Sequence, residues 1–360
     1  MKLFSSILLL YIFTSISSFG QSANQKSLDP NGFVNKYDTN FNGIGPKVYI
    51  LPLPRTLKEE MIDTYKEIVD FQDSIINSLK HQRLLSYFQK TTNQHKINSI
   101  VPDSSTVSEE TAKQYIEQNN HPIVYALYNG FALDYLEQHQ NVKALEALRI
   151  ALSHAQSSNN QDDIAIIQSN IASAYLLTGK LEEAGPLENA YFVHAQKNKE
   201  LADQASSQTR IALIEAYKKN YKAAENTIIR KAIPLFNNSK FYAGKIEAWM
   251  ILAEIYRSQN KHTEAQWFLI QARDLAKKQE LHDNLAMIEY MLGSSKMIQN
   301  NFKVAKNELE LAWNLATDGS NKHLQMAIAE QLGRANVNLG DYDAAKDYLE
   351  RYWELRNTLF

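Results

Sequence analysis

Residues 171–184 read Ile-Ala-Ser-Ala-Tyr-Leu-Leu-Thr-Gly-Lys-Leu-Glu-Glu-Ala, and this stretch decides the fold of the chain. It places small residues at Ala172 and Ala184, an aromatic residue at Tyr175 and a turn glycine at Gly179. The same pattern returns about every forty residues. The first small position is Ala132, Ala172, Ala212, Ala253, Gly293 and Gly333, and the second is Ala144, Ala184, Ala224, Ala265, Ala305 and Ala345. All are small, with one residue of slip, so the chain contains an internal repeat.

Each repeat unit predicts a helix, a turn and a second helix. The turns carry residues suited to a helix end, namely His139, Gly179, Lys219 with Asn220, Asn260, Asn300 and Gly340. Two antiparallel helices approach closely where a side chain is small, so the small residues mark the contact within each pair. Large apolar residues of the second helices, Leu148, Ile228, Leu269, Leu309 and Leu349, fill the space between pairs, while Glu188 interrupts this column. One pair cannot bury its own apolar face, so the pairs must stack.

The repeat resembles the tetratricopeptide repeat (TPR) family. The positions that match its signature are Trp249, Leu252, Ala253, Tyr256, Ala265 and Ala272 in one unit, Ala172, Tyr175, Gly179 and Ala184 in another, and Leu332, Gly333, Gly340, Tyr342 and Ala345 in the last. The third unit departs most, with Glu215 where the aromatic residue belongs. The resemblance implies an all-α fold: a right-handed α-solenoid of antiparallel helix pairs with an N-terminal helical cap. The long period implies longer helices than the usual unit of about 34 residues.

Composition narrows the class of function. The chain has 360 residues, 44% hydrophobic and 22% charged, which is ordinary for a folded soluble protein. Its formal net charge of −2 argues against a nucleic-acid partner. The absence of cysteine excludes disulfides, thiolate metal sites and a cysteine nucleophile. The sequence has no catalytic motif, no metal-ligand spacing among its histidines and no phosphate-binding loop, so we expect no enzyme activity, metal or cofactor.

The first 20 residues predict a secretory signal. Met1 and Lys2 precede an apolar run, and Ser18 and Gly20 are small residues suited to signal cleavage. The run is short for a spanning helix, so we expect an exported, periplasmic or secreted protein without a stable membrane span. Residues 21–56 predict an irregular segment with a short extended stretch at 48–51. Within it, residues 38–43 resemble the start of a calcium loop, but Tyr49 stands where the last carboxylate belongs, so we interpret them as a loop.

Residues 57–120 predict a helical region that lacks the repeat signature. Apolar residues recur at spacings of three and four from Met61 to Phe88, which indicates amphipathic helix. We interpret it as an N-terminal cap of the array, with dimerisation through the 57–95 helices as the alternative. A short helix follows a linker broken by Pro102, with Glu109 in its first turn. Residues 121–360 then form six repeats.

The resemblance also implies where a partner binds, because the first helices of such pairs line a concave groove. The predicted groove residues are Asn129, Leu133, Ser169, Ser173, Thr209, Leu213, Met250, Glu254, Arg257, Tyr290, Ser294, Glu330 and Arg334. Their mixture of apolar, hydroxyl and charged side chains suits a protein or peptide partner. The Lys/Asn clamp that some family members use for a terminal carboxylate is not evident here.

The C-terminal helix suggests two functions. Helical arrays usually end in a polar capping helix, whereas Tyr352, Trp353, Leu355, Leu359 and Phe360 would lie at an open end. The first hypothesis is an exported scaffold or adaptor, with self-association through Trp353, Leu359 and Phe360 as one use of that end. The alternative is a periplasmic sensor module of a two-component or transcription-regulatory system, because the last helix resembles those that precede signalling domains in bacterial regulators.

Overall fold

A computed structural model describes residues 34–35, 49–50, 54–68, 72–92 and 109–359. The predicted signal at 1–20 and the calcium-like stretch at 38–43 lie outside these residues. The chain divides into two units, Met1–Glu59 and Glu60–Phe360. In the first unit, β1 (Val34–Asn35) pairs antiparallel with β2 (Tyr49–Ile50), which agrees with the extended stretch predicted at 48–51. No helix among the described residues is long and apolar enough to cross a membrane.

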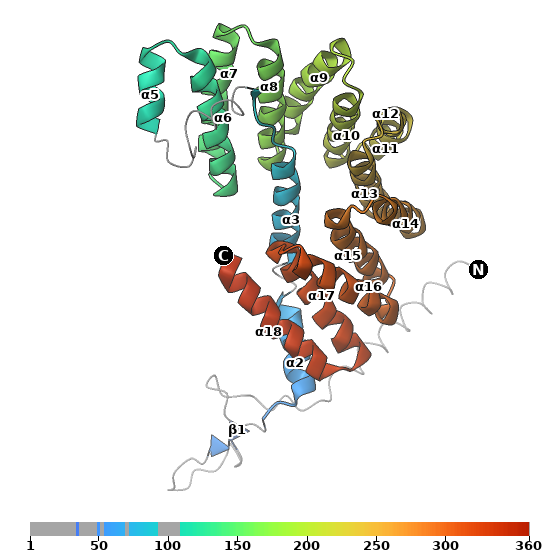
Figure 1. Ribbon diagram of the computed structural model, residues 1–360. Helices are drawn as coiled ribbons and strands as arrows, with labels where there is room; N and C mark the ends of the chain where they lie inside the picture. Colours follow the sequence, from blue (N-terminus) through green and yellow to red (C-terminus); the bar gives the residue numbers. More distant parts are fainter. Residues whose placement is uncertain (1–33, 36–48, 51–53, 69–71, 93–108, 360) are drawn as a thin grey trace, which may run out of the picture. The chain divides into compact units, whose positions relative to one another are not determined.

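The second unit contains the repeats as six consecutive helix pairs (Figure 1). The pairs are α6 (His121–Glu137) with α7 (Asn141–Ser157), α8 (Gln161–Leu177) with α9 (Leu181–Lys197), α10 (Leu201–Tyr217) with α11 (Tyr221–Thr227), η3 (Ile228–Ala232) and α12 (Ile233–Ser239), α13 (Tyr242–Ser258) with α14 (His262–Lys278), α15 (His282–Ile298) with α16 (Phe302–Asp318), and α17 (Lys322–Leu339) with α18 (Tyr342–Leu359). Both series of small residues are buried between helices, as the sequence predicts. The predicted fold class, an α-solenoid, is confirmed.

A left-handed residue lies in each turn between consecutive helices of the array, from α6 to α18. The predicted turn residues His139, Gly179, Lys219, Asn260, Asn300 and Gly340 all have positive φ angles, between 57° and 80°. The breaks between units also contain such residues, at Asn159, Lys199, Lys240, Glu280 and Ser320. This conformation lets the chain reverse while its N–H groups bond the last carbonyls of the helix. The left-handed turn conformation therefore recurs along the chain in step with the helices.

The one-residue slip in the repeat has a structural cause in the third pair. Its second helix contains a π-helical segment, Ile228–Ala232, in which the backbone takes up one extra residue. Pro234 follows directly and has no N–H to donate to the preceding turn. Ile228 and Phe236 on either side remain buried, so the insertion keeps the apolar face of this helix against its neighbours.

The region at 57–120 has two roles. The short helix α5 (Glu109–Glu117) packs against α6 and covers the first repeat, as a cap does. The helices α2 (Leu57–Ile68) and α3 (Gln72–Ser86) lie elsewhere. Helix α3 contacts α6, α8 and α17, the first helices of the first, second and last pairs, and in Figure 1 the array curves around it. The amphipathic pattern of 57–95 therefore serves contacts on the inner side of the array.

Helix α2 is anchored on the last repeat by Tyr65. The Tyr65 side chain lies directly over Gly333 of α17, so that a Cβ atom at position 333 would stand 1.5 Å from the Tyr65 hydroxyl. The hydroxyl donates a hydrogen bond to the Ala345 carbonyl oxygen of α18 at 3.0 Å. Burial raises the pKa of this phenol well above its usual range. The small residue at 333 thus admits an aromatic side chain from outside the repeats.

The C-terminal helix is less open than its sequence suggests. Tyr352 was expected at an exposed end, but it is only 1% exposed. It follows Ala345 and Leu349 along the face of α18 that packs against α17, which explains its burial. Trp353, Leu355 and Leu359 are half-buried, and Phe360 lies outside the described residues.

A buried carboxylate lies among the last repeats, away from α3. Glu289 of α15 is fully buried, and its nearest cation is Arg273 of α14 at 3.8 Å. The same guanidinium lies 3.9 Å from Glu308 of α16. Burial and the neighbouring Glu308 carboxyl raise the pKa of Glu289 to about 8, because ionisation would place a second negative charge in a dry site.

Candidate functional site on the inner side of the array

The inner side of the array holds a segment of its own chain. We call residues 72–92 the inner segment; it comprises α3 and the residues that follow it. It forms hydrogen bonds with residues of four of the six helix pairs, on α6, α8, α9, α13 and α17, and these residues are far from it in sequence. The inner segment therefore binds where the resemblance places a peptide ligand.

Two asparagines hold the main chain of this segment. The Asn170 side chain of α8 accepts a hydrogen bond from the Gln89 N–H at 2.8 Å and donates one to the Gln89 carbonyl oxygen at 2.8 Å. Asn129 of α6 donates to the same carbonyl at 3.1 Å and accepts from Asn170. The Tyr191 hydroxyl of α9 donates to the Gln89 side chain at 3.1 Å. These contacts satisfy both the N–H and the carbonyl oxygen of Gln89, so they select an extended backbone at this residue.

A buried aspartate receives the end of the inner segment. Asp163 of α8 accepts hydrogen bonds from the Thr92 N–H at 2.7 Å and from the Thr92 hydroxyl. It also accepts from the Tyr125 hydroxyl of α6 at 2.7 Å and from Asn160. A buried carboxylate is tolerated only when its oxygens are so bonded, and Thr92 supplies part of this bonding. Removing the segment would leave Asp163 less well satisfied.

Charged contacts join α3 to α13. The Arg83 guanidinium forms a two-pronged pair with the Glu254 carboxylate, one N–H···O distance being 2.8 Å. One turn later, the Tyr87 hydroxyl donates a short hydrogen bond to Glu247. Burial raises the pKa of Glu247, partly opposed by this bond, whereas for Glu254 the charge and hydrogen bonds of Arg83 outweigh burial and lower the pKa. The lowered pKa favours the ionised form of Glu254, which binds the Arg83 cation of the inner segment.

A buried ion pair packs beside Tyr87, the residue that bonds to Glu247. Glu188 of α9, which interrupts the apolar column in the sequence, lies 2.8 Å from Arg210 of α10, and both are buried. Ser169 donates to the other oxygen of Glu188 at 3.0 Å. The Arg210 guanidinium faces the rings of Tyr87 and Tyr191 at 5.9 and 5.3 Å, which favours cation–π attraction. The interrupted column is therefore part of the surface that holds Tyr87.

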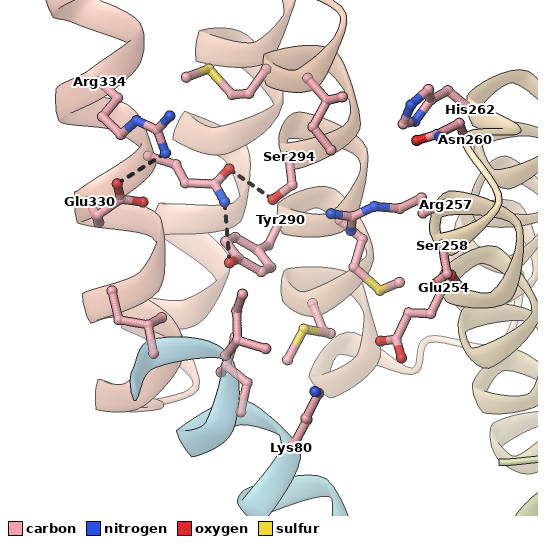
Figure 2. A pocket seen from close by; sticks show the side chains of 18 of the residues that line it. Lys80, Glu254, Arg257, Ser258, Asn260, His262, Tyr290, Ser294, Glu330 and Arg334 are labelled. Carbon is pink, nitrogen blue, oxygen red and sulfur yellow. Dashed lines mark hydrogen bonds and ion pairs between the residues drawn. The ribbon is translucent and has the colours of Figure 1, made fainter. Parts of the chain in front are cut away.

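Beside α3 lies a cavity of about 710 Å³ between α3, α13, α15 and α17 (Figure 2). Its apolar wall includes Ile75, Leu79, Met287, Met291, Met297 and Ile298. Its polar wall contains Lys80, Arg257 and Arg334, with Arg334 lying 3.4 Å from Glu330. Arg257 extends from α13 toward the cavity and forms no ion pair within the described part of the chain. With Glu254 and Glu330 both paired, Lys80 and Arg257 leave the cavity positively charged.

Six of the predicted groove residues line this cavity: Glu254, Arg257, Tyr290, Ser294, Glu330 and Arg334. Gln331 bridges two of them, because it accepts from the Ser294 hydroxyl at 2.8 Å and donates to the Tyr290 hydroxyl at 3.3 Å. Burial raises the pKa of Tyr290 to about 12, so the phenol stays protonated and can donate. The structure thus brings together the predicted groove residues of the last three repeats, except Met250.

The other seven predicted groove residues lie away from the cavity. Asn129 binds Gln89, Ser169 bonds to Glu188, and Thr209 bonds to the carbonyl oxygen of its own helix. Ser173, Leu213 and Met250 are buried, and Leu133 is half-buried. The groove of the early repeats is therefore largely internal packing together with the grip on Gln89.

Among the contact residues that were not predicted, only Asn170 could have been recognised from the sequence. Asn170 lies in the middle of a buried helix, where a polar residue of low helix propensity is unfavourable unless its amide has a partner. Lys80 and Arg83 carry no such signal, because an amphipathic pattern does not show what covers its faces. They were assigned to a cap or a dimer helix, and their role on the inner side was not predicted.

The comparisons with known proteins agree with this geometry. Residues 328–358 match the tetratricopeptide repeat family model. A signal-transduction ATPase with a TPR sensor from Pyrococcus horikoshii is 15% identical, with a TM-score of 0.54, over 84% of this chain and 47% of that one. BtubC (BKLC) from P. vanneervenii is 14% identical, with a TM-score of 0.50, over 61% of this chain and 90% of that one. The family match thus covers most of the last helix pair, and the array shares its fold with these two structures.

One curated protein also matches part of the chain. The Endoribonuclease Dicer homolog 2a of Oryza sativa is 33% identical over 114 residues, which are 31% of this chain and 8% of that protein. The chain thus spans a small part of that relative's length, and the match assigns no activity. Within the described residues, no group of three or more His, Asp or Glu side chains could hold a metal ion.

Proposed function

We propose that this TPR protein is an exported adaptor that binds a protein or peptide segment on the inner side of its array, without making or breaking a covalent bond. The observation that carries this proposal is the grip of Asn129 and Asn170 on the main chain of Gln89. The two asparagines bond to the main-chain N–H and carbonyl oxygen of Gln89, and Tyr191 bonds to its side chain. The array therefore already binds one peptide segment in the way that a partner would be bound.

The cavity beside α3 supports the chemistry of the partner. Its methionine and isoleucine wall can adapt to different apolar side chains. The cations Lys80 and Arg257 would attract a carboxylate from a segment that enters it. A partner segment with an acidic residue beside an apolar one fits this wall. The Lys80 ammonium also lies 5.7 Å from the Tyr217 ring, which keeps it close to the array.

Export is part of the proposal and rests on the sequence from Met1 to Gly20. N-terminal sequencing of the protein from the envelope fraction should begin near Gln21. A protein that retains Met1 in the soluble cell extract would contradict export.

A sensor module is the second candidate. The solved structure that shares this fold over 84% of the chain is described as a signalling ATPase with a TPR sensor. In this reading the bound segment is a signal rather than a scaffolded protein. A bound partner that is a short soluble peptide, rather than a folded envelope protein, would favour this candidate.

Site-specific photo-crosslinking tests the binding proposal. A photoreactive amino acid in place of Ser294, which faces the cavity, should capture the partner in the envelope fraction. The same amino acid in place of Lys278, exposed on the second helix α14, is the control and should capture little. Replacing Arg257 and Arg334 together by alanine should reduce capture at 294. Equal capture at both positions, or capture unchanged by the arginine substitutions, would contradict the proposal.

A further inference from the structure

The inner segment is held as a ligand is held. Its contacts with α13 are spaced by about one helical turn: Arg83 and Tyr87, four residues apart, bind Glu254 and Glu247. Gln89 follows the end of the helix and is bound through its main-chain N–H and carbonyl oxygen and through its side chain. Arginine, tyrosine and glutamine at positions i, i+4 and i+6 thus form one recognition pattern. Arg83 and Tyr87 bind two carboxylates of one helix, α13, and Gln89 binds residues of α6, α8 and α9.

The receiving surface contains polar groups that need an occupant. The Glu247 and Glu254 carboxylates and the Asn170 amide all point at the inner segment and bond to it. Within the described residues, the side-chain hydrogen bonds of Glu247 and Glu254 go to the inner segment, whereas Asn170 also bonds to Asn129 of the neighbouring pair. Buried or half-buried charged groups that serve no stacking contact are typical of a recognition surface. The surface is therefore built for a segment with a cation and an aromatic hydroxyl.

We infer that this surface is a recognition site for helical protein segments with the arginine–tyrosine–glutamine spacing of Arg83, Tyr87 and Gln89, and that the chain's own inner segment is its resident competitor. This inference rests on the proposed function and adds the partner's pattern and its regulation. A tethered segment acts at an effective concentration on the order of millimolar. A partner with the same pattern therefore binds only when it is tighter than the resident copy or when that copy is loosened.

A synthetic peptide of residues 72–92 with a fluorescent label tests the inference on the full-length chain. In the wild-type chain the resident copy blocks the site, so binding should be weak. The Arg83→Glu substitution repels the resident copy from Glu254 but leaves the receiving surface intact. Binding to this variant, followed by fluorescence anisotropy, should be at least tenfold tighter than to wild type. The matched control Asn77→Ala changes an exposed residue of α3 and should bind like wild type.

A charge reversal tests whether the Arg83 position carries recognition. The Glu254→Arg chain repels its own Arg83 and should bind a peptide carrying the Arg83→Glu change at least tenfold better than the unaltered peptide. The Arg83→Glu chain should show the reverse preference. These reciprocal preferences would not arise from a general loosening of the array.

Circular dichroism of each variant establishes that its helix content matches wild type before binding is measured. Folded Arg83→Glu and Glu254→Arg chains that bind neither peptide would overturn the inference and make the inner segment a permanent part of the fold. If crosslinking at position 294 still captures a partner in that case, the proposed function stands alone. If no partner is captured there, both fail.

Discussion

A glycine-to-alanine substitution inside a helix usually stabilises a protein, but at Gly333 it should destabilise the chain, because the Tyr65 side chain occupies the space of the new methyl group. Alanine in place of a glycine inside a helix normally stabilises by about 1 kcal/mol. At position 333 the new Cβ atom would lie 1.5 Å from the Tyr65 hydroxyl and 2.0 Å from the ring carbon that carries it. Ordinary contact begins near 3.4 Å, so the ring must move by about 2 Å and lose its hydrogen bond to Ala345.

Overpacking of this kind costs roughly 1–3 kcal/mol, which exceeds the helical gain. We expect Gly333→Ala to destabilise the wild-type chain by about 1–2 kcal/mol. In a Tyr65→Ala background the clash is absent, so the same substitution should stabilise by about 1 kcal/mol. The sign of the effect therefore reports whether Tyr65 lies on the last repeat.

Urea unfolding of the four chains of this double-mutant cycle measures the coupling between Gly333 and Tyr65. Gly185→Ala is the matched control, because no atom lies within 4 Å of a Cβ built at this helical glycine. It should raise the midpoint in both backgrounds. A Gly333→Ala substitution that raises the midpoint equally with and without Tyr65 would refute the placement of α2.

Three further predictions follow from buried or strained groups. Glu289→Gln should raise the free energy of unfolding at pH 7 by about 1–3 kcal/mol. The Glu289 carboxyl has a raised pKa in the folded chain, so its contribution to stability falls as the pH rises from its unfolded pKa near 4.5 toward 8. Urea titrations at pH 5 and pH 8 that show no larger gain at pH 8 would count against this. Glu280→Gly should raise the thermal midpoint, since a non-glycine residue in the left-handed conformation costs about 1 kcal/mol; an unchanged or lower midpoint would contradict it. Burial lowers the pKa values of His81 on α3 and His323 on α17, and the nearby His139 adds repulsion. The stability that the neutral histidines give to the docking of α3 is therefore present above pH ~6.5 and lost at lower pH. The hydrogen-exchange protection factors of α3, which are corrected for the intrinsic exchange rate at each pH, should fall at pH 5.5, and equal protection factors at pH 5.5 and 7.5 would disprove this.

The array itself was predictable because each unit repeats the same physical needs. A small residue is needed where two helices touch, and a left-handed residue is needed where each helix ends. Both recur in register along the sequence, from Ala132 and His139 to Gly333 and Gly340. Because these signals are local, each unit can be recognised without its neighbours, and the number and order of helix pairs follow.

The occupant of the inner side could not be predicted in the same way. The apolar spacing in 57–95 shows that these helices bury a face, but the same spacing suits a cap, a dimer or an inner strut. The partners of Arg83 and Gln89 lie 171 and 81 residues away in the sequence. No local pattern marks such pairs. The exception is Glu188, whose break in an apolar column does reveal a buried ionic contact.

The placement of the cavity residues shows the same division. Counting along the repeat found Glu254, Arg257, Tyr290, Ser294, Glu330 and Arg334, because their positions are fixed by the first helix of each unit. The count could not tell that Ser169 and Thr209 are used for contacts within the array. Nor could it tell that Glu254 is already paired with Arg83.

The central claim is that residues 72–92 lie along the inner side of their own array, and the contact between Ser78 and His323 tests it most directly. The Ser78 hydroxyl lies 2.6 Å from the His323 ring nitrogen, although the two residues are 245 positions apart. The chain has no cysteine, so the pair Ser78→Cys with His323→Cys introduces the only two thiols. Mild oxidation should form an intramolecular disulfide rapidly in the dilute protein, whereas Asn77→Cys with His323→Cys should react slowly. Equal rates for the two pairs, or only intermolecular disulfides, would contradict the account.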